Sequence, residues 1–131
     1  MNDTELERYS RHILLNEFDI VSQEKLSSAT ALMIGCGGLA NACAPILASA
    51  GLGHIIVCDG DTIELSNLQR QFAFTEADIG KHKAEVLKTY LQARNSQIQI
   101  SSIHQFVDET FLHDCLPQCD VIIDCSDNSR T

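Results

Sequence analysis

The chain has 131 residues, of which 44% are hydrophobic, so it is long enough for one packed domain and short for a complete doubly wound enzyme. Its formal net charge of -9 and pI of about 4.8 argue against nucleic acid and anionic membranes as partners. Its N-terminus is polar, and no apolar run approaches the roughly 18 residues of a membrane span, so we expect a cytoplasmic protein without a signal peptide.

The first 29 residues predict a helical arm. Apolar residues recur at helical spacing over residues 4–15, and residues 19–27 form a second short helical segment. Two helices ahead of a strand need a surface to pack on, so we expect residues 1–29 to lie over the sheet or over a neighbouring subunit. From the residues alone, Arg11 fits a solvated helix face.

The stretch from residue 30 to residue 61 predicts a strand, a glycine turn, a helix, a strand and a carboxylate. The apolar run at residues 31–34 is typical of a strand buried on both faces. Gly35, Gly37 and Ala40 then fit the Gly-x-Gly-x-x-Gly/Ala fingerprint of a nucleotide-binding turn. The second strand ends in Asp59, 24 residues after Gly35, where a carboxylate can bind ribose hydroxyls. The alternative is a helix-capping turn beside an ordinary surface aspartate.

Residues 38–50 predict a helix that is apolar nearly all round and therefore buried. Pro45 inside it removes one backbone donor, which predicts a kink. The six cysteines include several in apolar strand runs, so reduced thiols are favoured over disulfides. Cys115 and Cys119 lack the second cysteine pair that a structural zinc site requires.

Residues 61–80 lack periodicity and are too long for an ordinary connection, so we predict a functional loop. Its one permanent cation is Arg70, and the alternative is an ordinary surface loop. A helix is predicted over residues 81–94, with Lys81 and Lys83 in its first turn. Because cations there oppose the helix dipole, the pair favours a neighbouring phosphate; the alternative is two solvated lysines.

The remaining segments predict a strand at residues 98–103, a short helix at residues 110–116 and a strand at residues 121–123. The last strand delivers Asp127 to the carboxyl edge of the sheet, where open α/β sheets bind ligands. Asp127 is therefore a candidate magnesium ligand, or otherwise a helix N-cap. Residues 30–131 are thus predicted to form a Rossmann-like α/β domain, a mostly parallel sheet with helices on both faces, behind the N-terminal helical arm.

Six motifs stand in the order and spacing of a known family. They are Arg-Tyr-Ser-Arg at 8–11, Gly-Cys-Gly-Gly-Leu at 35–39, Asp-Gly-Asp at 59–61, Ser-Asn-Leu-Gln-Arg-Gln at 66–71, Gly-Lys-His-Lys at 80–83 and Asp-Cys-Ser-Asp-Asn at 124–128. On these motifs, essentially the whole chain resembles the MoeB/ThiF family, relatives of the ubiquitin-activating E1 adenylation domain. The resemblance implies an enzyme that uses ATP and Mg²⁺ to adenylate the C-terminal glycine of a ubiquitin-like sulfur-carrier protein ending in Gly-Gly. Pyrophosphate is released, and the sulfur serves a molybdopterin or thiamine type of pathway.

The resemblance also implies a role for each matching residue. Asp59 would hold the ribose of ATP. Asn67, Arg70 and Lys83 would bind the phosphates. Asp127 would hold Mg²⁺, and Arg11 would reach across a homodimer interface to the triphosphate of the other subunit. The other implied nucleotide contacts are Gly35, Gly37, Gly38, Asp61, Ser66, Gln71 and Asn128.

Members of that family continue beyond the position matched by residue 131. We therefore expect residues 30–131 to be the N-terminal part of an adenylation domain whose C-terminal part is missing. Zinc or a catalytic cysteine is expected only in that C-terminal part. Cys36 and Cys43, in the predicted turn and buried helix, are poor candidates for a catalytic cysteine.

Two other functions stay open. The glycine turn and Asp59 also fit an NAD-binding oxidoreductase, but a pyrophosphate can rest on a helix N-terminus, so Arg11, Arg70 and Lys83 exceed what NAD requires. The second alternative is a non-catalytic E1-like subunit that keeps the fold for dimerisation. Retention of these three cations and of Asp127 argues against it.

Overall fold

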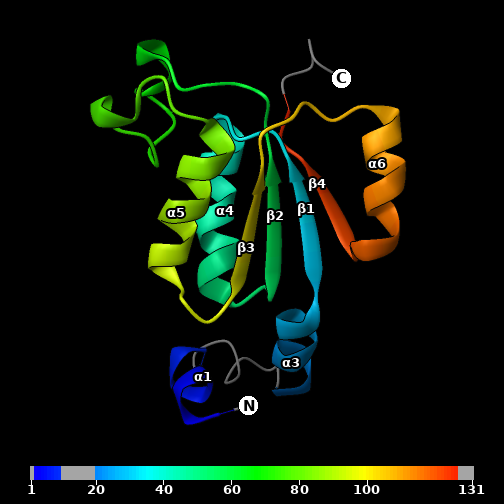
Figure 1. Ribbon diagram of the computed structural model, residues 1–131. Helices are drawn as coiled ribbons and strands as arrows, with labels where there is room; N and C mark the ends of the chain where they lie inside the picture. The colour runs from blue at the N-terminus through cyan, green and yellow to red at the C-terminus, as the bar shows by residue number, and fades with distance from the viewer. Residues whose placement is uncertain (1, 10–19, 127–131) are drawn as a thin grey trace.

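The computed structural model describes residues 2–9 and 20–126, which form a four-stranded parallel sheet with helices (Figure 1). The strands are β1 (Thr30–Ile34), β2 (His54–Cys58), β3 (Gln99–Ile103) and β4 (Val121–Asp124), in the spatial order β3-β2-β1-β4. Leu32 of β1 stands opposite Ile56 of β2 and Ile122 of β4. Because all four strands run in one direction, their carboxyl ends meet at one edge of the sheet.

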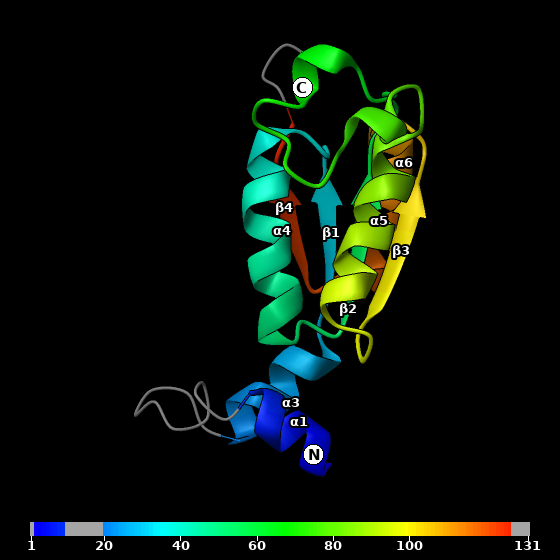
Figure 2. The same ribbon diagram turned by 90° about the vertical axis from the view of Figure 1, so that its left-hand side faces the viewer.

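Helices cover both faces of this sheet. The helices α4 (Gly38–Ala50) and α5 (Lys83–Arg94) lie on one face, and α6 (Glu109–Cys115) lies on the other (Figures 1 and 2). Parallel strands need a helical crossover and are buried on both sides, which explains the continuous apolar runs of the sequence. The predicted Rossmann-like sheet with helices on both faces is confirmed. None of the described helices is long and apolar enough to cross a membrane.

The strand β1, one of the two inner strands of the sheet, contributes to two separate cores. Met33 belongs to the larger core, which includes Leu87 of α5, whereas Leu32 belongs to the smaller one, which includes Ile56. Both β1 side chains are fully buried. Successive side chains of a strand point to opposite faces, so this short strand anchors the helices of both layers.

Short 3₁₀ turns interrupt the segments between the main elements. The predicted loop at residues 61–80 contains η1 (Leu65–Asn67) and η2 (Glu76–Asp78), and η3 (Leu116–Gln118) follows α6. An isolated bridge joins Thr62 to His82 at the two ends of the loop. The two ends of the loop are therefore held together, and the loop lies beyond the carboxyl edge of the sheet (Figure 1).

The N-terminal helices lie at the opposite, amino-terminal edge of the sheet (Figures 1 and 2). They are α1 (Asp3–Arg8) and α3 (Ile20–Ser28). Tyr9, which caps α1, is only 3% exposed, and its hydroxyl accepts a hydrogen bond of 2.8 Å from Nδ2 of Asn95. The same Asn95 nitrogen donates to the Ala48 carbonyl near the end of α4. This contact fastens the arm to the ends of α4 and α5.

Of the sequence expectations about helices, one is tested only in part and one differs from the structure. The first predicted helix, residues 4–15, is described only as α1, and the rest lies outside the described residues. The helix α4 is not buried all round, since Leu39 and Ile46 are 61% and 69% exposed. A helix that lies on a sheet buries only one side, here Ala40, Ala44 and Ala48, whatever the hydropathy of its other side.

Candidate functional site

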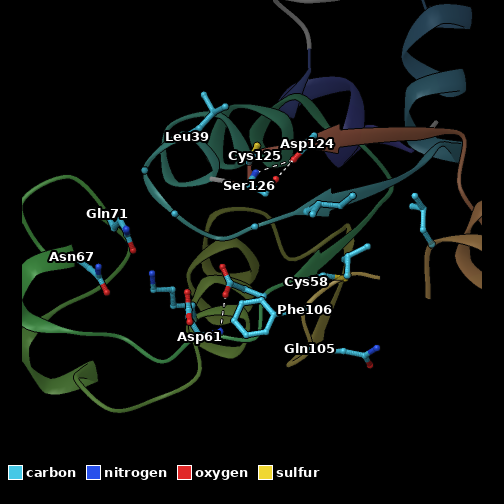
Figure 3. A pocket seen from close by; sticks show the side chains of 18 of the residues that line it. Leu39, Cys58, Asp61, Asn67, Gln71, Gln105, Phe106, Asp124, Cys125 and Ser126 are labelled. Atoms are coloured by element: carbon cyan, nitrogen blue, oxygen red, sulfur yellow. Dashed lines mark hydrogen bonds between the residues drawn. The ribbon is translucent and has the colours of Figure 1, made fainter. Parts of the chain in front are cut away.

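A cavity of about 1200 Å³ opens at the carboxyl edge of the sheet. It is lined by the glycine turn, the ends of β1, β2 and β4, the loop after β2, the start of α5 and the segment between β3 and α6. Figure 3 shows Asn67 and Gln71 from the loop on one side, with Asp61 and Phe106 near the ends of β2 and β3. Open parallel sheets bind ligands at this edge, so the cavity is the candidate site.

The glycine turn forms the floor of the cavity. Gly35 has a φ of +90°, and a Cβ built on it would stand 2.9 Å from the Cys125 carbonyl oxygen and the Ser126 Cα. Only glycine combines this left-handed backbone with so close an approach. Gly37 then caps α4, and Gly38 begins it, so the N-terminus of a 13-residue helix faces the cavity. Free backbone N–H groups and the helix dipole at this end favour a phosphate.

Asp59 at the end of β2 is 9% exposed and holds the turn in place. Its Oδ2 accepts a hydrogen bond of 2.7 Å from the Cys36 backbone N–H, and its Oδ1 accepts one of 2.7 Å from the Asp61 backbone N–H. A carboxylate has about four acceptor positions, so both oxygens retain capacity for ribose hydroxyls. Burial first, and then the Asp59 charge, raise the pKa of the Cys36 thiol well above its ordinary value. Cys36 is therefore an inert part of the turn, as the sequence indicated.

The loop after β2 supplies polar side chains to the cavity. Asn67 is 9% exposed, and its Oδ1 accepts a hydrogen bond of 2.8 Å from the Glu64 backbone N–H, which leaves its amide nitrogen for a ligand. Arg70 lies along the start of α4, with its Cδ 3.5 Å from the position of a Cβ on Gly38. Ser66 is exposed and is not among the lining residues. The structure thus brings Asn67 and Arg70 to the cavity and leaves Ser66 outside it.

Gln71 carries an orphaned oxygen inside the cavity wall. Its side chain is 3% exposed, and its Oε1 is buried with no hydrogen-bond partner in the described part of the chain. A buried amide oxygen without a partner costs roughly 1–3 kcal/mol. The Oε1 of Gln23, which does not line the cavity, is unpartnered in the same way within the described residues, so this feature by itself does not identify a ligand site.

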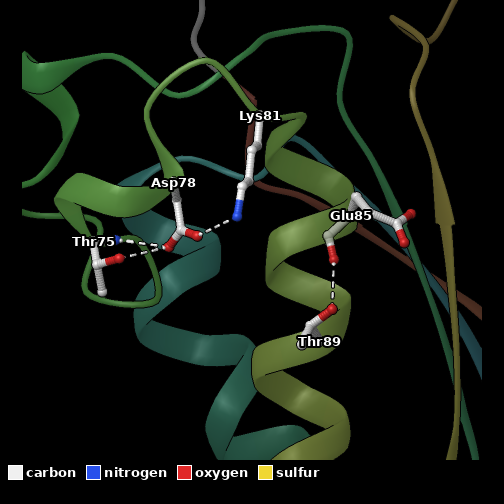
Figure 4. A network of polar contacts seen from close by, with 5 residues as sticks. All are labelled: Thr75, Asp78, Lys81, Glu85 and Thr89. Atoms are coloured by element: carbon white, nitrogen blue, oxygen red, sulfur yellow. Dashed lines mark hydrogen bonds and ion pairs between the residues drawn. The ribbon is translucent and has the colours of Figure 1, made fainter.

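The sequence predicted that Lys81 and Lys83 both lie beside a phosphate, but the structure places only Lys83 at the cavity. Lys83 is the first residue of α5, is 7% exposed and lines the cavity. His82 is the N-cap of α5, so Lys81 falls before the helix, which corrects its predicted place in the first turn. Lys81 instead points its Nζ toward Oδ1 of Asp78, 3.5 Å away (Figure 4). Of the two, only Lys83 lies on the wall of the cavity.

The segment between β3 and α6 forms a wall that the sequence did not predict. Its lining residues are Gln105, Phe106, Val107 and Asp108, and the adjoining first turn of α6 adds Glu109 and Leu112. Phe106 packs over Gly60, where an added Cβ would overlap its ring. The only sequence signal for this wall was its position directly after a strand, at the edge where ligands bind.

The end of β4 forms the remaining wall. Asp124 and Ser126 both line the cavity, and the backbone N–H and the hydroxyl of Ser126 donate to Oδ1 of Asp124 (Figure 3). These hydrogen bonds lower the pKa of Asp124 below its ordinary value, so its carboxylate is ionised at neutral pH. The predicted site residues Arg11, Asp127 and Asn128 lie outside the described residues.

Metal-binding clusters are absent from residues 2–9 and 20–126, where no three His, Cys, Asp or Glu side chains are placed to hold an ion. All six cysteines are free thiols, as the sequence predicted. Cys115 and Cys119 are half-buried in the smaller core. The structure therefore gives no zinc site in the described part of the chain.

These features are typical of nucleotide-binding α/β domains: a glycine turn at a helix N-terminus, a buried carboxylate on the next strand, and cations from the following loop and helix. Comparison with known families agrees, because the profile described as the ThiF family matches residues 9–131. The chain belongs to the ThiF family.

Relatives of known name share this region. The chain is 41% identical, over 131 residues, to the sulfur carrier protein ThiS adenylyltransferase of Escherichia coli (strain K12), and covers 52% of that protein. It is 38% identical over 128 residues, or 98% of its length, to the molybdopterin-synthase adenylyltransferase of the same organism and covers 51% of it. The crystal structure of E. coli MccB with ATP aligns with a TM-score of 0.77 and 44% identity, over 86% of this chain and 35% of that one. The chain thus spans about half the length of these curated relatives.

Proposed function

We propose that this chain is the nucleotide-binding part of an enzyme that adenylates the C-terminal glycine of a ubiquitin-like sulfur-carrier protein ending in Gly-Gly. The observation that carries the proposal is the meeting of Arg70 and buried Lys83 at the cavity whose floor is the glycine turn. In this assignment residues 30–131 form the N-terminal part of the adenylation domain, and residues 1–29 form its helical arm. The named functions of the relatives support the same reaction class.

The geometry suits attack of a carboxylate on the α-phosphate of ATP. Both groups are anionic, so the reaction needs cations where charge collects on the departing pyrophosphate. Arg70 can grip phosphate oxygens with two N–H groups, and Lys83 supplies a compact charge beside the turn. Asp59 would orient the ribose. The attacking carboxylate is ionised at neutral pH, so no side chain has to remove a proton.

Magnesium fits the acidic edge of this cavity. Mg²⁺ in nucleotide sites is usually held by one or two carboxylates together with the phosphates and water, so a preformed group of three ligands is not required. Asp127 is the predicted ligand, and it follows the ionised Asp124 by three residues. When bound, the ion would neutralise charge on the pyrophosphate.

ATP is the proposed nucleotide in preference to NAD. Two cations meet at the cavity in the described part of the chain, more than a dinucleotide pyrophosphate on a helix N-terminus requires. A relative at 44% identity was also crystallised with ATP. Thermal shift with ATP and Mg²⁺ against NAD tests this choice. Stabilisation by NAD alone would overturn it.

The proposal includes a homodimer in which Arg11 serves the cavity of the partner. Tyr9, the last described residue before Arg11, is fastened to the ends of α4 and α5 that lie away from the cavity (Figure 1). The 13 residues of α4 span about 20 Å from its end beside Tyr9 to its N-terminus at the cavity. The two residues of chain from Tyr9 to Arg11 span at most about 7 Å, so the distance favours a cavity of another subunit for Arg11. The exposed Ile46 on α4 offers apolar surface for a partner. Sedimentation of the whole protein as a monomer would contradict this part.

The decisive experiment is pyrophosphate exchange into ATP that depends on a carrier protein ending in Gly-Gly. The reaction belongs in the cytoplasm, where ATP is present and cysteines stay reduced. Carrier-dependent exchange would support the proposal. A protein that binds ATP and shows no exchange with any Gly-Gly carrier would favour the non-catalytic subunit instead.

A further inference from the structure

Two thiols face each other beside the floor of the cavity. The Sγ atoms of Cys43 and Cys125 are 3.9 Å apart, although 82 residues separate them in the chain. Cys43 lies on α4 and is half-buried, whereas Cys125 directly follows β4, is buried and lines the cavity. Neither thiol has a part in the proposed adenylation.

The backbone of Cys125 is held tightly. Its N–H donates a hydrogen bond of 2.8 Å to the Ile34 carbonyl, and its own carbonyl oxygen packs against Gly35. A disulfide has an S–S distance of about 2.0 Å, so the two Sγ atoms would have to approach by about 1.9 Å. Rotation of the two cysteine side chains can supply part of this approach, and the remainder has to come from α4, because the Cys125 backbone is fixed to β1 and to the turn. The first turns of α4 line the cavity, so a displacement of α4 would change the shape of the nucleotide site.

We propose that Cys43 and Cys125 form a reversible disulfide, and that its closure weakens nucleotide binding. The reagent is a small disulfide such as oxidised glutathione. The Cys43 thiolate attacks one sulfur of this oxidant and releases one small thiolate. Cys125 then gives up its proton, and its thiolate attacks the Cys43 sulfur. The second small thiolate departs and takes up a proton, so a second small thiol leaves. Two protein thiols are oxidised, and one small disulfide is reduced to two thiols.

The order of these two steps follows from the surroundings of the thiols. Cys125 is buried, whereas Cys43 is only half-buried, so a small oxidant reaches Cys43 more readily. Thiolates are the attacking species, and access also limits the rate. The half-buried Cys43 is therefore the first to react. Disulfides in reducing compartments are usually transient and redox-sensing, which agrees with a reversible bond.

The effect on ATP rests on the proposed function, whereas formation of the bond does not. In the test, the purified protein is incubated with oxidised glutathione and digested without reduction, and its peptides are identified by mass spectrometry. We expect a linked pair of peptides that contain Cys43 and Cys125. ATP titration of the oxidised protein should show about tenfold weaker binding than the reduced protein. Dithiothreitol should reverse both changes.

Two variants make the test specific. Cys43→Ala removes one half-buried sulfur outside the cavity lining, and its ATP affinity should not respond to the oxidant. Cys119→Ser changes a half-buried thiol in the other core, and this control should respond as the unaltered protein does. A glutathione adduct on Cys43 without the link, a link between other cysteines, or equal ATP binding before and after linkage would overturn the proposal. Reduced protein that fails to bind ATP would contradict the proposed function, while the peptide map would still decide whether the bond forms.

Discussion

Asp59 and Cys36 are joined by a hydrogen bond of 2.7 Å between the Cys36 backbone N–H and the Asp59 carboxylate, which ties the glycine turn to the end of β2. The second carboxylate oxygen accepts from the Asp61 N–H, so one side chain holds both the glycine turn after β1 and the start of the loop after β2. The residue predicted to bind ribose therefore also shapes the turn predicted to bind phosphate. This double role gives a first prediction.

Replacing Asp59 with alanine should lower stability as well as nucleotide binding. The change leaves two N–H donors without partners near a buried position, and each unsatisfied group costs about 1–3 kcal/mol. Urea unfolding measures the loss of stability, and ATP titration at a temperature where the variant is folded measures affinity. Asp59→Asn keeps one oxygen acceptor and should lose less stability. Equal losses for both variants would contradict the hydrogen-bonding role.

Replacing Arg70 or Lys83 with alanine should reduce carrier-dependent pyrophosphate exchange by about 10²-fold or more, the usual cost of removing one group that stabilises developing charge. Lys81→Ala is the matched control, because Lys81 is only two residues from Lys83 but is exposed and directed at Asp78. Its exchange rate should equal that of the unaltered protein. Unfolding temperatures must confirm that all three variants fold. An equal loss in Lys81→Ala would show that the assay reports general charge rather than the site.

The sequence predicted the sheet and most elements because apolar runs and glycine turns are local signals. It missed the exact start of α5, because the backbone of His82 is held extended by its bridge to Thr62 across the loop. A propensity for helix cannot reveal such a long-range contact. Because α5 begins at Lys83 and not at Lys81, Lys83 is the lysine that lines the cavity.

The site was predicted where it rests on motifs and missed where it rests on packing. Arg70, Lys83 and Asp59 lie in recognisable sequences, and the structure brings them to one cavity. Phe106 has no motif, and its place over Gly60 depends on how β3 aligns with β2. The exposed side of α4 was missed for a similar reason, because hydropathy records what a side chain is and not what covers it.

Gly35→Ala should destabilise the protein more than Gly80→Ala. Both glycines have left-handed backbone, with φ of +90° and +89°, so both variants bear a strain of about 1–2 kcal/mol. At Gly35 the added Cβ also meets the Cys125 carbonyl oxygen at 2.9 Å, whereas at Gly80 nothing lies within 4 Å. The difference between the two free energies of unfolding therefore isolates the steric overlap of the added Cβ with Cys125. We expect this overlap to cost about 1–3 kcal/mol more. Equal values would show that the turn can move away from the end of β4.

Asp78 should contribute a part of the stability that is lost in acid. The Thr75 backbone N–H and hydroxyl donate to its carboxylate, and Lys81 lies nearby, so the pKa of Asp78 in the folded protein is below its ordinary value (Figure 4). A carboxyl group with a lowered pKa binds its proton more weakly in the folded than in the unfolded state. Its contribution is therefore complete above the unfolded pKa of about 3.9 and disappears as the pH falls through the folded pKa.

Asp78→Asn removes this titration and keeps an oxygen acceptor for Thr75. Urea unfolding between about pH 3 and pH 7 should show a smaller acid loss in the variant than in the unaltered protein, with the gap between the two closing as the pH falls below about 3.9. Glu76→Gln in the same 3₁₀ turn is the control, because it removes a neighbouring negative charge without touching the Thr75 hydrogen bonds. A gap that stays constant over the whole range would mean that Asp78 acts through shape alone and that its charge is irrelevant to stability.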